Sequence, residues 1–195
     1  VCTWGHAQAP SAEVSTPHIR AELVAHAPQG VQVGQPLWVG LRLTHQPEWH
    51  TYWKNAGDSG LPTQLEWELP AGVTAGPTVW PLPSKLSVAD LTNYGFEGKT
   101  LLGVPLTLAP TFNSPTGTLE IKLKASWLVC RQECIPQEGQ FRLSVPVRSS
   151  QSAHAAEFQA LAQAQPQRLR GQDLQAEVGP DGHSDADVVL HAAGQ

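Results

Sequence analysis

Hydrophobic and polar residues alternate in several short segments between residues 15 and 150. Successive side chains of a β-strand point to opposite sides, so a period of two residues places one set on a single face. The clearest run covers residues 119–129, where the odd-numbered positions are apolar and positions 120–126 alternate with Glu, Lys or Ser. From this alternation we expect the following side chains to face inward: Leu41, Leu65, Trp67, Leu123, Trp127 and Leu143.

Turn-forming residues separate these segments, as in Pro28-Gln29-Gly30 and Pro70-Ala71-Gly72. Seven or eight short strands with polar outer faces are typical of an antiparallel sandwich. The sequence shows no alternation of strands with helices that would indicate a parallel sheet. We therefore predict an all-β, immunoglobulin-like β-sandwich over residues 15–150, with a disordered or frayed segment over residues 1–14.

The pattern changes after residue 150. Apolar residues recur at helical spacing between Ser152, a residue suited to begin a helix, and Pro166, which cannot continue one. We predict a short helix or linker over residues 151–170. Residues 171–195 contain two short apolar runs around a Gly-Pro-Asp-Gly turn, which predicts the start of a second, truncated β domain.

Composition narrows the classes of function. Hydrophobic residues make up 41% of the 195 residues and the net charge is −5, which disfavours a nucleic-acid-binding protein. No apolar run in the sequence is long enough for a membrane-spanning helix. Met is absent, so we expect the chain to be a mature or trimmed piece of a longer protein.

Two of the three cysteines, Cys130 and Cys134, lie four positions apart directly after the alternating run 119–129, whereas Cys2 lies near the N-terminus. Cys130 has the parity of the polar positions of that run. We therefore expect Cys130 to lie on the solvent face, within reach of a partner, with Leu128 as an apolar neighbour. Cys2 is expected to stay outside the pair.

Four readings are open for this pair: unpaired thiols, a structural disulfide in a non-catalytic immunoglobulin-like binding module, a metal carrier, and thiol–disulfide exchange. A structural disulfide that closes a loop of about 5 residues would contribute only about 2 kcal/mol, less than one that joins distant strands. A metal carrier would need two further ligands, and the eight histidines are scattered. Thiol–disulfide exchange needs two close thiols and one sulfur open to attack, which a short hairpin turn can supply. The spacing favours exchange, and we expect neither a metal nor a cofactor.

Three segments together resemble the N-terminal periplasmic domain of the DsbD/ScsB-like protein-disulfide reductases. They are Trp49 to Thr63 (WHTYWKNAGDSGLPT), Tyr94 to Lys99 (YGFEGK) and Trp127 to Pro136 (WLVCRQECIP). The resemblance covers roughly residues 15–150 and implies an immunoglobulin-like domain, with the family's membrane-embedded and thioredoxin-like domains outside this chain.

The resemblance implies an enzyme domain for periplasmic electron relay, in a protein-disulfide reductase of the inner membrane with a link to cytochrome c biogenesis. The domain would accept electrons from a thioredoxin-like domain supplied by the membrane reductase domain, and would reduce periplasmic thioredoxin-like partners. Cys130 and Cys134 match the family's cysteine pair, and Cys134 matches the cysteine that forms the mixed disulfide. No cofactor and no nucleic acid is implied.

The family also has a cap loop whose Phe covers the disulfide. Phe96 matches that position, with Tyr94 and Glu97 beside it, so the resemblance implies that Phe96 lies over the sulfurs on a flexible loop. The best-known DsbD proteins have acidic residues before this Phe and space their cysteines more widely, so Tyr94 and Gly95 favour a ScsB-like or divergent branch. Outside the pair, we expect Trp49, Tyr52 and Trp53 to pack at the core and rim, and Asn55–Gly60 to form a turn.

Overall fold

The alternating segments form antiparallel strands in the computed structural model, which describes residues 11–88 and 90–165. Within these residues, eleven strands precede one short helix. The elements are β1 (Glu13–Ser15), β2 (Ile19–His26), β3 (Leu37–His45), β4 (His50–Gly57), β5 (Gln64–Glu68), β6 (Val73–Ala75), β7 (Ser84–Val88), β8 (Leu91–Glu97), β9 (Lys99–Leu108), β10 (Thr118–Cys130), β11 (Cys134–Pro146) and α1 (Ala155–Gln163).

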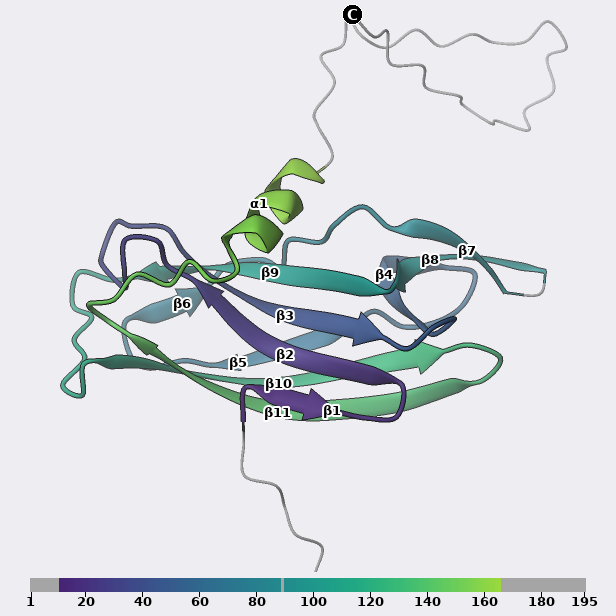
Figure 1. The fold of residues 1–195 in the computed structure, drawn as a ribbon, viewed down its shortest axis with the longest axis horizontal. Coiled ribbons are helices and arrows are strands. Elements are labelled where there is room, and N and C mark those ends of the chain that lie inside the picture. Colours follow the sequence, from purple (N-terminus) through teal and green to yellow (C-terminus); the bar gives the residue numbers. More distant parts are fainter. Residues whose placement is uncertain (1–10, 89, 166–195) are drawn as a thin grey trace, which may run out of the picture. The chain divides into compact units, whose positions relative to one another are not determined.

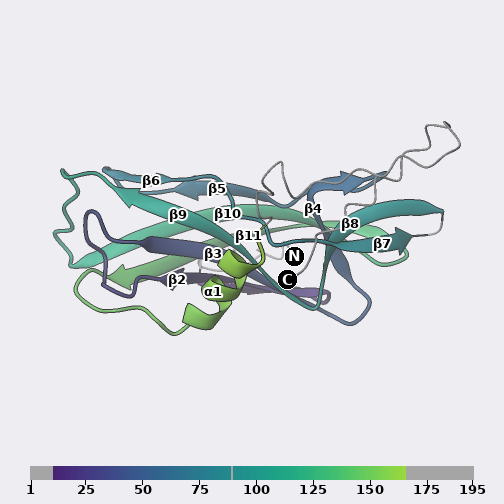
Figure 2. The same ribbon diagram turned by 90° about the horizontal axis from the view of Figure 1, so that it is seen from above.

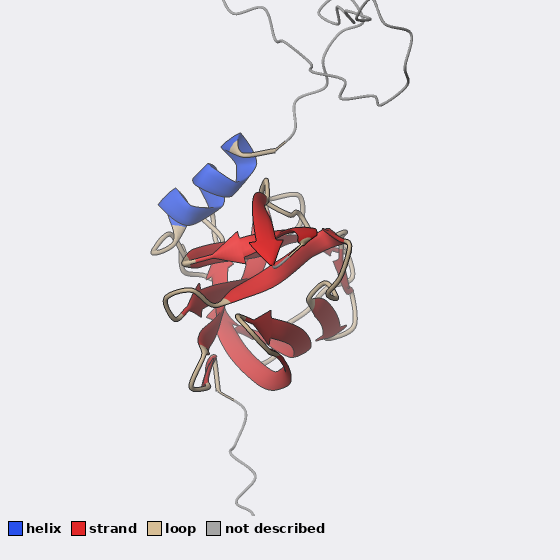
Figure 3. Cartoon of the chain, turned by 90° about the vertical axis from the view of Figure 1, so that its right-hand side faces the viewer, coloured by secondary structure: helices blue, strands red, loops and turns tan. Residues whose placement is uncertain are grey.

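The strands form two sheets that face each other (Figures 1 and 2). One sheet has the strand order β1-β2-β3-β9-β6, and the other has the order β11-β10-β4-β8-β7, with β5 paired to β10. Seen end-on, the strands enclose the interior between two layers (Figure 3). The predicted all-β, immunoglobulin-like sandwich is confirmed.

The core lies between the sheets and is built from the positions that alternation selected. Leu41, Leu123 and Trp127 are buried, with exposed fractions of 0%, 2% and 3%. The other three predicted residues pack half-buried against the same cluster: Leu65, Trp67 and Leu143. The inward faces of β3, β5, β10 and β11, which carry these six residues, were therefore predicted correctly, because burial of apolar side chains fixes the register of a strand.

The longest strands, β10 and β11, form a hairpin of 13 residues on each side. Their register runs from Thr118 opposite Pro146 to Cys130 opposite Cys134, so the two cysteines form the last pair before the turn. At the same end, β4 joins the other side of β10 and places His50 opposite Cys130. The hairpin alone thus brings the two cysteines together.

Residues 11–14, which we expected to be frayed, take part in the sandwich. β1 pairs with β2, and Ser11 forms a bridge to Phe141 in β11. Val14 packs against the core, which accounts for the order of this segment because apolar contact offsets the entropy of fixing it. The predicted frayed segment therefore does not extend over residues 11–14. Residues 1–10, which include Cys2, lie outside the described residues.

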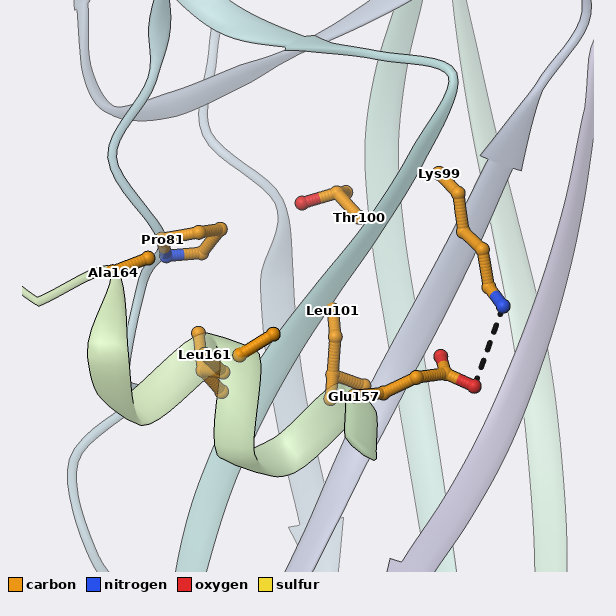
Figure 4. A pocket seen from close by; sticks show the side chains of 8 residues that line it. Pro81, Lys99, Thr100, Leu101, Glu157, Leu161 and Ala164 are labelled. Atoms are coloured by element: carbon orange, nitrogen blue, oxygen red, sulfur yellow. Dashed lines mark ion pairs between the residues drawn. The ribbon is translucent and has the colours of Figure 1, made fainter. Parts of the chain in front are cut away.

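The predicted helix is present as α1, although it begins at Ala155 with His154 as its N-cap, and not at Ser152. Phe158 and Leu161 of α1 are buried against Val24 and Leu101 on the outer face of the first sheet. A pocket of about 240 Å³ lies between α1 and β9, where Lys99 and Glu157 form an ion pair with an N–O distance of 3.3 Å (Figure 4). The predicted second domain, residues 171–195, lies outside the described residues.

No helix within residues 11–88 and 90–165 has the length and apolar character needed to cross a membrane.

Candidate functional site

Cys130 and Cys134 are joined in a disulfide at the end of the β10–β11 hairpin, as the predicted pairing requires. The two sulfur-bearing residues differ strongly in accessibility. Cys130 is 1% exposed, whereas Cys134 is exposed to solvent. The prediction that Cys130 would be the reachable cysteine is therefore wrong, and Cys134 is the one that an attacking thiolate can approach.

The physical reason lies in what covers the outer face of β10. Cys130 does point away from the shared core, as its parity predicts, and it lies in a separate cluster of buried side chains. That cluster consists of Tyr52 and Ala56 from β4, with Leu128 packed beside them. Strand parity identifies the face of the sheet, but it does not reveal that β4 places side chains over that face. We call Tyr52, Ala56, Leu128 and Cys130 the disulfide patch.

Tyr52 makes the direct polar contact to the disulfide. Its hydroxyl oxygen lies 3.7 Å from Sγ of Cys134. The same oxygen lies 3.4 Å from Nε2 of His50, and the two rings meet edge to face at a centroid distance of 5.3 Å. Tyr52 is 2% exposed and His50 is 4% exposed, so both groups face the disulfide away from bulk water.

Burial keeps these two side chains uncharged near neutral pH. Desolvation lowers the pKa of His50, against the opposing attraction of Glu97. Desolvation also raises the pKa of Tyr52, against the opposing hydrogen bond of Ser59. The phenol therefore keeps its proton and can donate it in a hydrogen bond.

Phe96 does not lie over the sulfurs. It is opposite Thr51 in the β4–β8 register, one position from the pair of His50 with Glu97, so it points to the other side of the sheet. There it is 6% exposed within the main core and stacks on Trp80 at a ring-centroid distance of 6.4 Å. The expectation of a Phe96 cap is corrected: the aromatic ring at the disulfide is that of Tyr52.

The segment expected to be a flexible cap loop is a strand, β8. Gly95 is required there because a Cβ atom would overlap the carbonyl oxygen of Thr51 in β4. Tyr94 is exposed and shares the parity of Phe96, so the register places it on the side away from Cys130. Of the three residues expected in the cap, Glu97 alone shares the face of the disulfide patch.

A groove of about 550 Å³ lies beside the hairpin turn. His50, Glu97 and Arg131 are among the residues that line it, and Arg131 pairs with Glu48 at an N–O distance of 3.1 Å. The groove therefore carries charged groups of both signs close to the cysteine pair, since His50 is opposite Cys130 and Arg131 follows Cys130 in the chain.

Within the described part of the chain, no group of three or more His, Cys, Asp and Glu side chains is arranged to hold a metal ion. The alternative of a metal carrier thus has no ligand cluster to rest on among these residues.

Sequence reasoning missed Tyr52 and His50 as members of the site. Both lie in the segment 49–63 that carries the family resemblance, which was the available signal, but Tyr52 was assigned to core and rim packing. Only the pairing of β4 with β10 shows that this segment borders the cysteines.

The fold and the site together define an immunoglobulin-like β-domain that presents one sulfur of a disulfide to solvent. The sequence profile described as "Thiol:disulfide interchange protein DsbD, N-terminal" matches residues 20–146. The chain therefore belongs to the family of DsbD N-terminal domains, a family of thiol–disulfide interchange proteins. No curated protein sequence matches the chain.

Two solved structures match the chain, and the first of them shows a similar fold. The N-terminal periplasmic domain of ScsB from Proteus mirabilis superposes with a TM-score of 0.58 at 18% identity, and the match covers 79% of this chain and 58% of that one. The N-terminal domain of DsbD from Neisseria meningitidis, in its reduced form, gives a TM-score of 0.35 at 12% identity and covers 64% of this chain and 87% of that one. The present chain thus spans less than two thirds of the ScsB domain.

Proposed function

We propose that this domain is an electron relay that takes reducing equivalents from a thioredoxin-like reductase domain and passes them to periplasmic thioredoxin-like proteins. The observation that carries the proposal is the asymmetry of the disulfide, in which Cys134 is exposed and Cys130 is 1% exposed. Exchange through a mixed disulfide needs one sulfur that a partner can reach and a second that stays close by.

The exchange then runs in two stages. A thiolate of the electron donor attacks Sγ of Cys134, the Cys130–Cys134 bond breaks, and Cys130 leaves as a thiolate that takes a proton from solvent. The donor's second thiolate attacks the donor sulfur of the mixed disulfide, which releases Cys134 as a thiolate and leaves the donor oxidised. In the second stage, the Cys134 thiolate attacks the partner's disulfide and displaces one partner thiolate. Cys130 then releases its proton, attacks Sγ of Cys134 and displaces the partner's second thiolate, so the Cys130–Cys134 disulfide forms again and two electrons reach the partner.

A purely structural role accounts less well for this disulfide. The cysteines are the last pair of a 13-residue hairpin ladder, so the backbone already holds them together. Closing a loop this short contributes only about 2 kcal/mol of chain entropy.

The experiment is to trap mixed disulfides, in a Cys2→Ser background, with a thioredoxin-like protein that lacks its resolving cysteine and carries its remaining cysteine as a mixed disulfide with thionitrobenzoate, which an attacking thiolate of this domain displaces. We expect Cys130→Ser, which leaves the exposed Cys134, to trap the partner, and Cys134→Ser, which leaves the buried Cys130, to trap little. The wild-type disulfide should show a reduction potential above about −300 mV in equilibrium with a thiol buffer. Equal trapping by both variants, or a potential below that value, would contradict the proposal.

A further inference from the structure

We propose that Tyr52 is a catalytic residue whose hydroxyl group donates a hydrogen bond to Sγ of Cys134 when that sulfur is a thiolate, and that the loop Gly57–Gly60 holds the phenol ring in place for this task. The inference rests on the proposed exchange function and assigns a residue to its chemistry.

The contact is already present in the oxidised protein. The Tyr52 oxygen lies 3.7 Å from Sγ of Cys134, the exposed cysteine, and 3.4 Å from Nε2 of His50. A disulfide sulfur is a weak acceptor, but a thiolate is an anion, and a hydrogen bond to an anion is about twice as strong as a neutral one. The same contact therefore stabilises Cys134 selectively after the disulfide opens.

The loop Gly57–Gly60 packs against the ring of Tyr52. Gly60 has a φ of +94°, and a Cβ atom there would overlap the ring carbons of Tyr52. Pro62, two residues later, forms a bridge with the Tyr52 backbone. Only a glycine allows the backbone to lie flat on the ring, because it lacks the Cβ and tolerates this conformation.

The loop is in turn anchored on β8. Asn93 is 0% exposed, and its side-chain oxygen accepts hydrogen bonds from the backbone nitrogen of Ser59 at 3.0 Å and from the Ser59 hydroxyl at 3.1 Å. Asp58 accepts a hydrogen bond from the backbone nitrogen of Thr92 at 2.8 Å and donates its own backbone N–H to the Thr92 oxygen at 3.0 Å. The segment that sequence reasoning treated as an ordinary turn thus connects β8 to the ring at the disulfide.

The hydroxyl acts at two points of the exchange. When the donor's second thiolate attacks the donor sulfur of the mixed disulfide, the S–S bond to Cys134 breaks and its electron pair stays on Cys134, where the phenol O–H stabilises the leaving thiolate. When Cys134 then attacks a partner disulfide, the same hydrogen bond has increased its thiolate fraction near neutral pH. Tyr52 keeps its proton throughout, and the proton of the Cys134 thiol is released to solvent.

The test is the pH dependence of Cys134 alkylation by iodoacetamide in the reduced 195-residue chain carrying Cys130→Ser, resolved by peptide mass so that Cys2 is read separately. We expect Tyr52→Phe, which removes only the oxygen, to move the midpoint of the profile upward by about one pH unit. The rate of Cys134 alkylation at pH 7 should fall several-fold, up to about tenfold. An unchanged midpoint in folded Tyr52→Phe would overturn the inference.

Two further variants sharpen the result. Tyr94→Phe removes the other tyrosine hydroxyl of the chain, on the opposite face of the sheet, and should leave the midpoint unchanged; an equal shift there would overturn the inference. Gly60→Ala should move the midpoint in the same direction as Tyr52→Phe by displacing the ring, and if it lowers the folded fraction then Tyr52→Phe decides alone. Failure of the wild-type chain to exchange with any thioredoxin-like probe would overturn the proposed function itself, whereas normal wild-type exchange with an unchanged Tyr52→Phe profile overturns only the role of Tyr52.

Discussion

Each sheet of the sandwich carries one covered apolar patch on the face turned away from the shared core. On one sheet this is the disulfide patch, and on the other it is a helix patch formed by Val24, Leu101, Phe158 and Leu161. The rims of the two patches differ in kind. The hydrogen-bonding partners of Tyr52 in the disulfide patch are uncharged, with the charged Glu97 and Arg131 in the neighbouring groove, whereas a cluster of ion pairs borders the helix patch.

The charged cluster centres on Arg42, whose side chain is 13% exposed. Arg42 pairs with Glu22 at 2.8 Å and with Glu157 of α1 at 2.7 Å, and Lys99 also reaches Glu157. Burial raises the pKa of Glu157, but the attraction of Arg42 and the hydrogen bonds of Lys99 and His154 outweigh it and hold the pKa below its ordinary value. Ion pairs thus help to hold α1 against the outer face of its sheet, a purely structural role.

At the disulfide patch, the inner polar contacts are a phenol and an uncharged imidazole. A phenol O–H can stabilise a thiolate by a hydrogen bond without placing a second charge in the buried patch. The two sheets thus bury similar apolar patches on their outer faces. Ion pairs border one patch, and an uncharged hydrogen-bond donor contacts the disulfide in the other.

The largest expected effect is on stability, and it tests whether a substitution in the main core leaves the reduction rate of the disulfide unchanged. Because Phe96 is 6% exposed in that core, Phe96→Ala should lower the free energy of unfolding by about 4 kcal/mol. The rate at which dithiothreitol reduces the folded protein should stay unchanged, since no contact of Phe96 with the sulfurs is removed. Chemical denaturation and the reduction rate, measured together, check this. A faster reduction with unchanged stability would restore Phe96 as a cap.

The second effect concerns pH and a buried histidine on the core side of β4. His45 bonds to Gly98 and to Thr51 of β4, and desolvation, against the opposing hydrogen bond of Gly98, lowers its pKa from 6.5 to about 4. Because the unfolded chain binds the proton more readily, the contribution of His45 is complete above pH 6.5 and is lost as the pH falls towards 4. This loss amounts to about 3 kcal/mol. Denaturation at several pH values should show a flatter profile for His45→Asn; an equally steep profile would contradict the assignment.

The third effect tests the charged rim of the helix patch. Arg42→Met keeps most of the side-chain length and leaves Glu22 and Glu157 without their shared cation. The free energy of unfolding should therefore fall by about 2 kcal/mol. Added salt should weaken the wild-type protein more than the variant, because the charged cluster is screened. Reduction of the disulfide should proceed at the wild-type rate; a slower or faster reaction would show that the patches are coupled.

The smallest effect is the matched control for Arg42. Lys122 and Glu68 pair across β10 and β5 with side chains 46% and 74% exposed, on a face that no helix covers. Lys122→Met should change the unfolding free energy by less than about 0.5 kcal/mol. A loss as large as that of Arg42→Met would remove the distinction between a covered and an uncovered charge pair.

The sequence was sufficient for the sandwich and for the cysteine pair, because both follow from local periodicity and from a short turn. It was insufficient where a distant strand decides the environment. Cys130 was assigned the right face and the wrong exposure, since the cover comes from Tyr52 on β4, about 80 residues away along the chain. Gly95 suggested flexibility, whereas the structure uses it for the close approach of β8 to Thr51.

The position of the cysteines at the end of a long hairpin ladder has a consequence for how the domain cycles. Cys130 and Cys134 are already direct neighbours across the two strands. The backbone pairing therefore holds the two residues together even when the disulfide is open. For the proposed relay, reduction and oxidation would then require little rearrangement of the scaffold. A donor and an acceptor would dock on the same surface in turn, and the direction of electron flow would follow from their relative potentials and not from a change of shape in the domain.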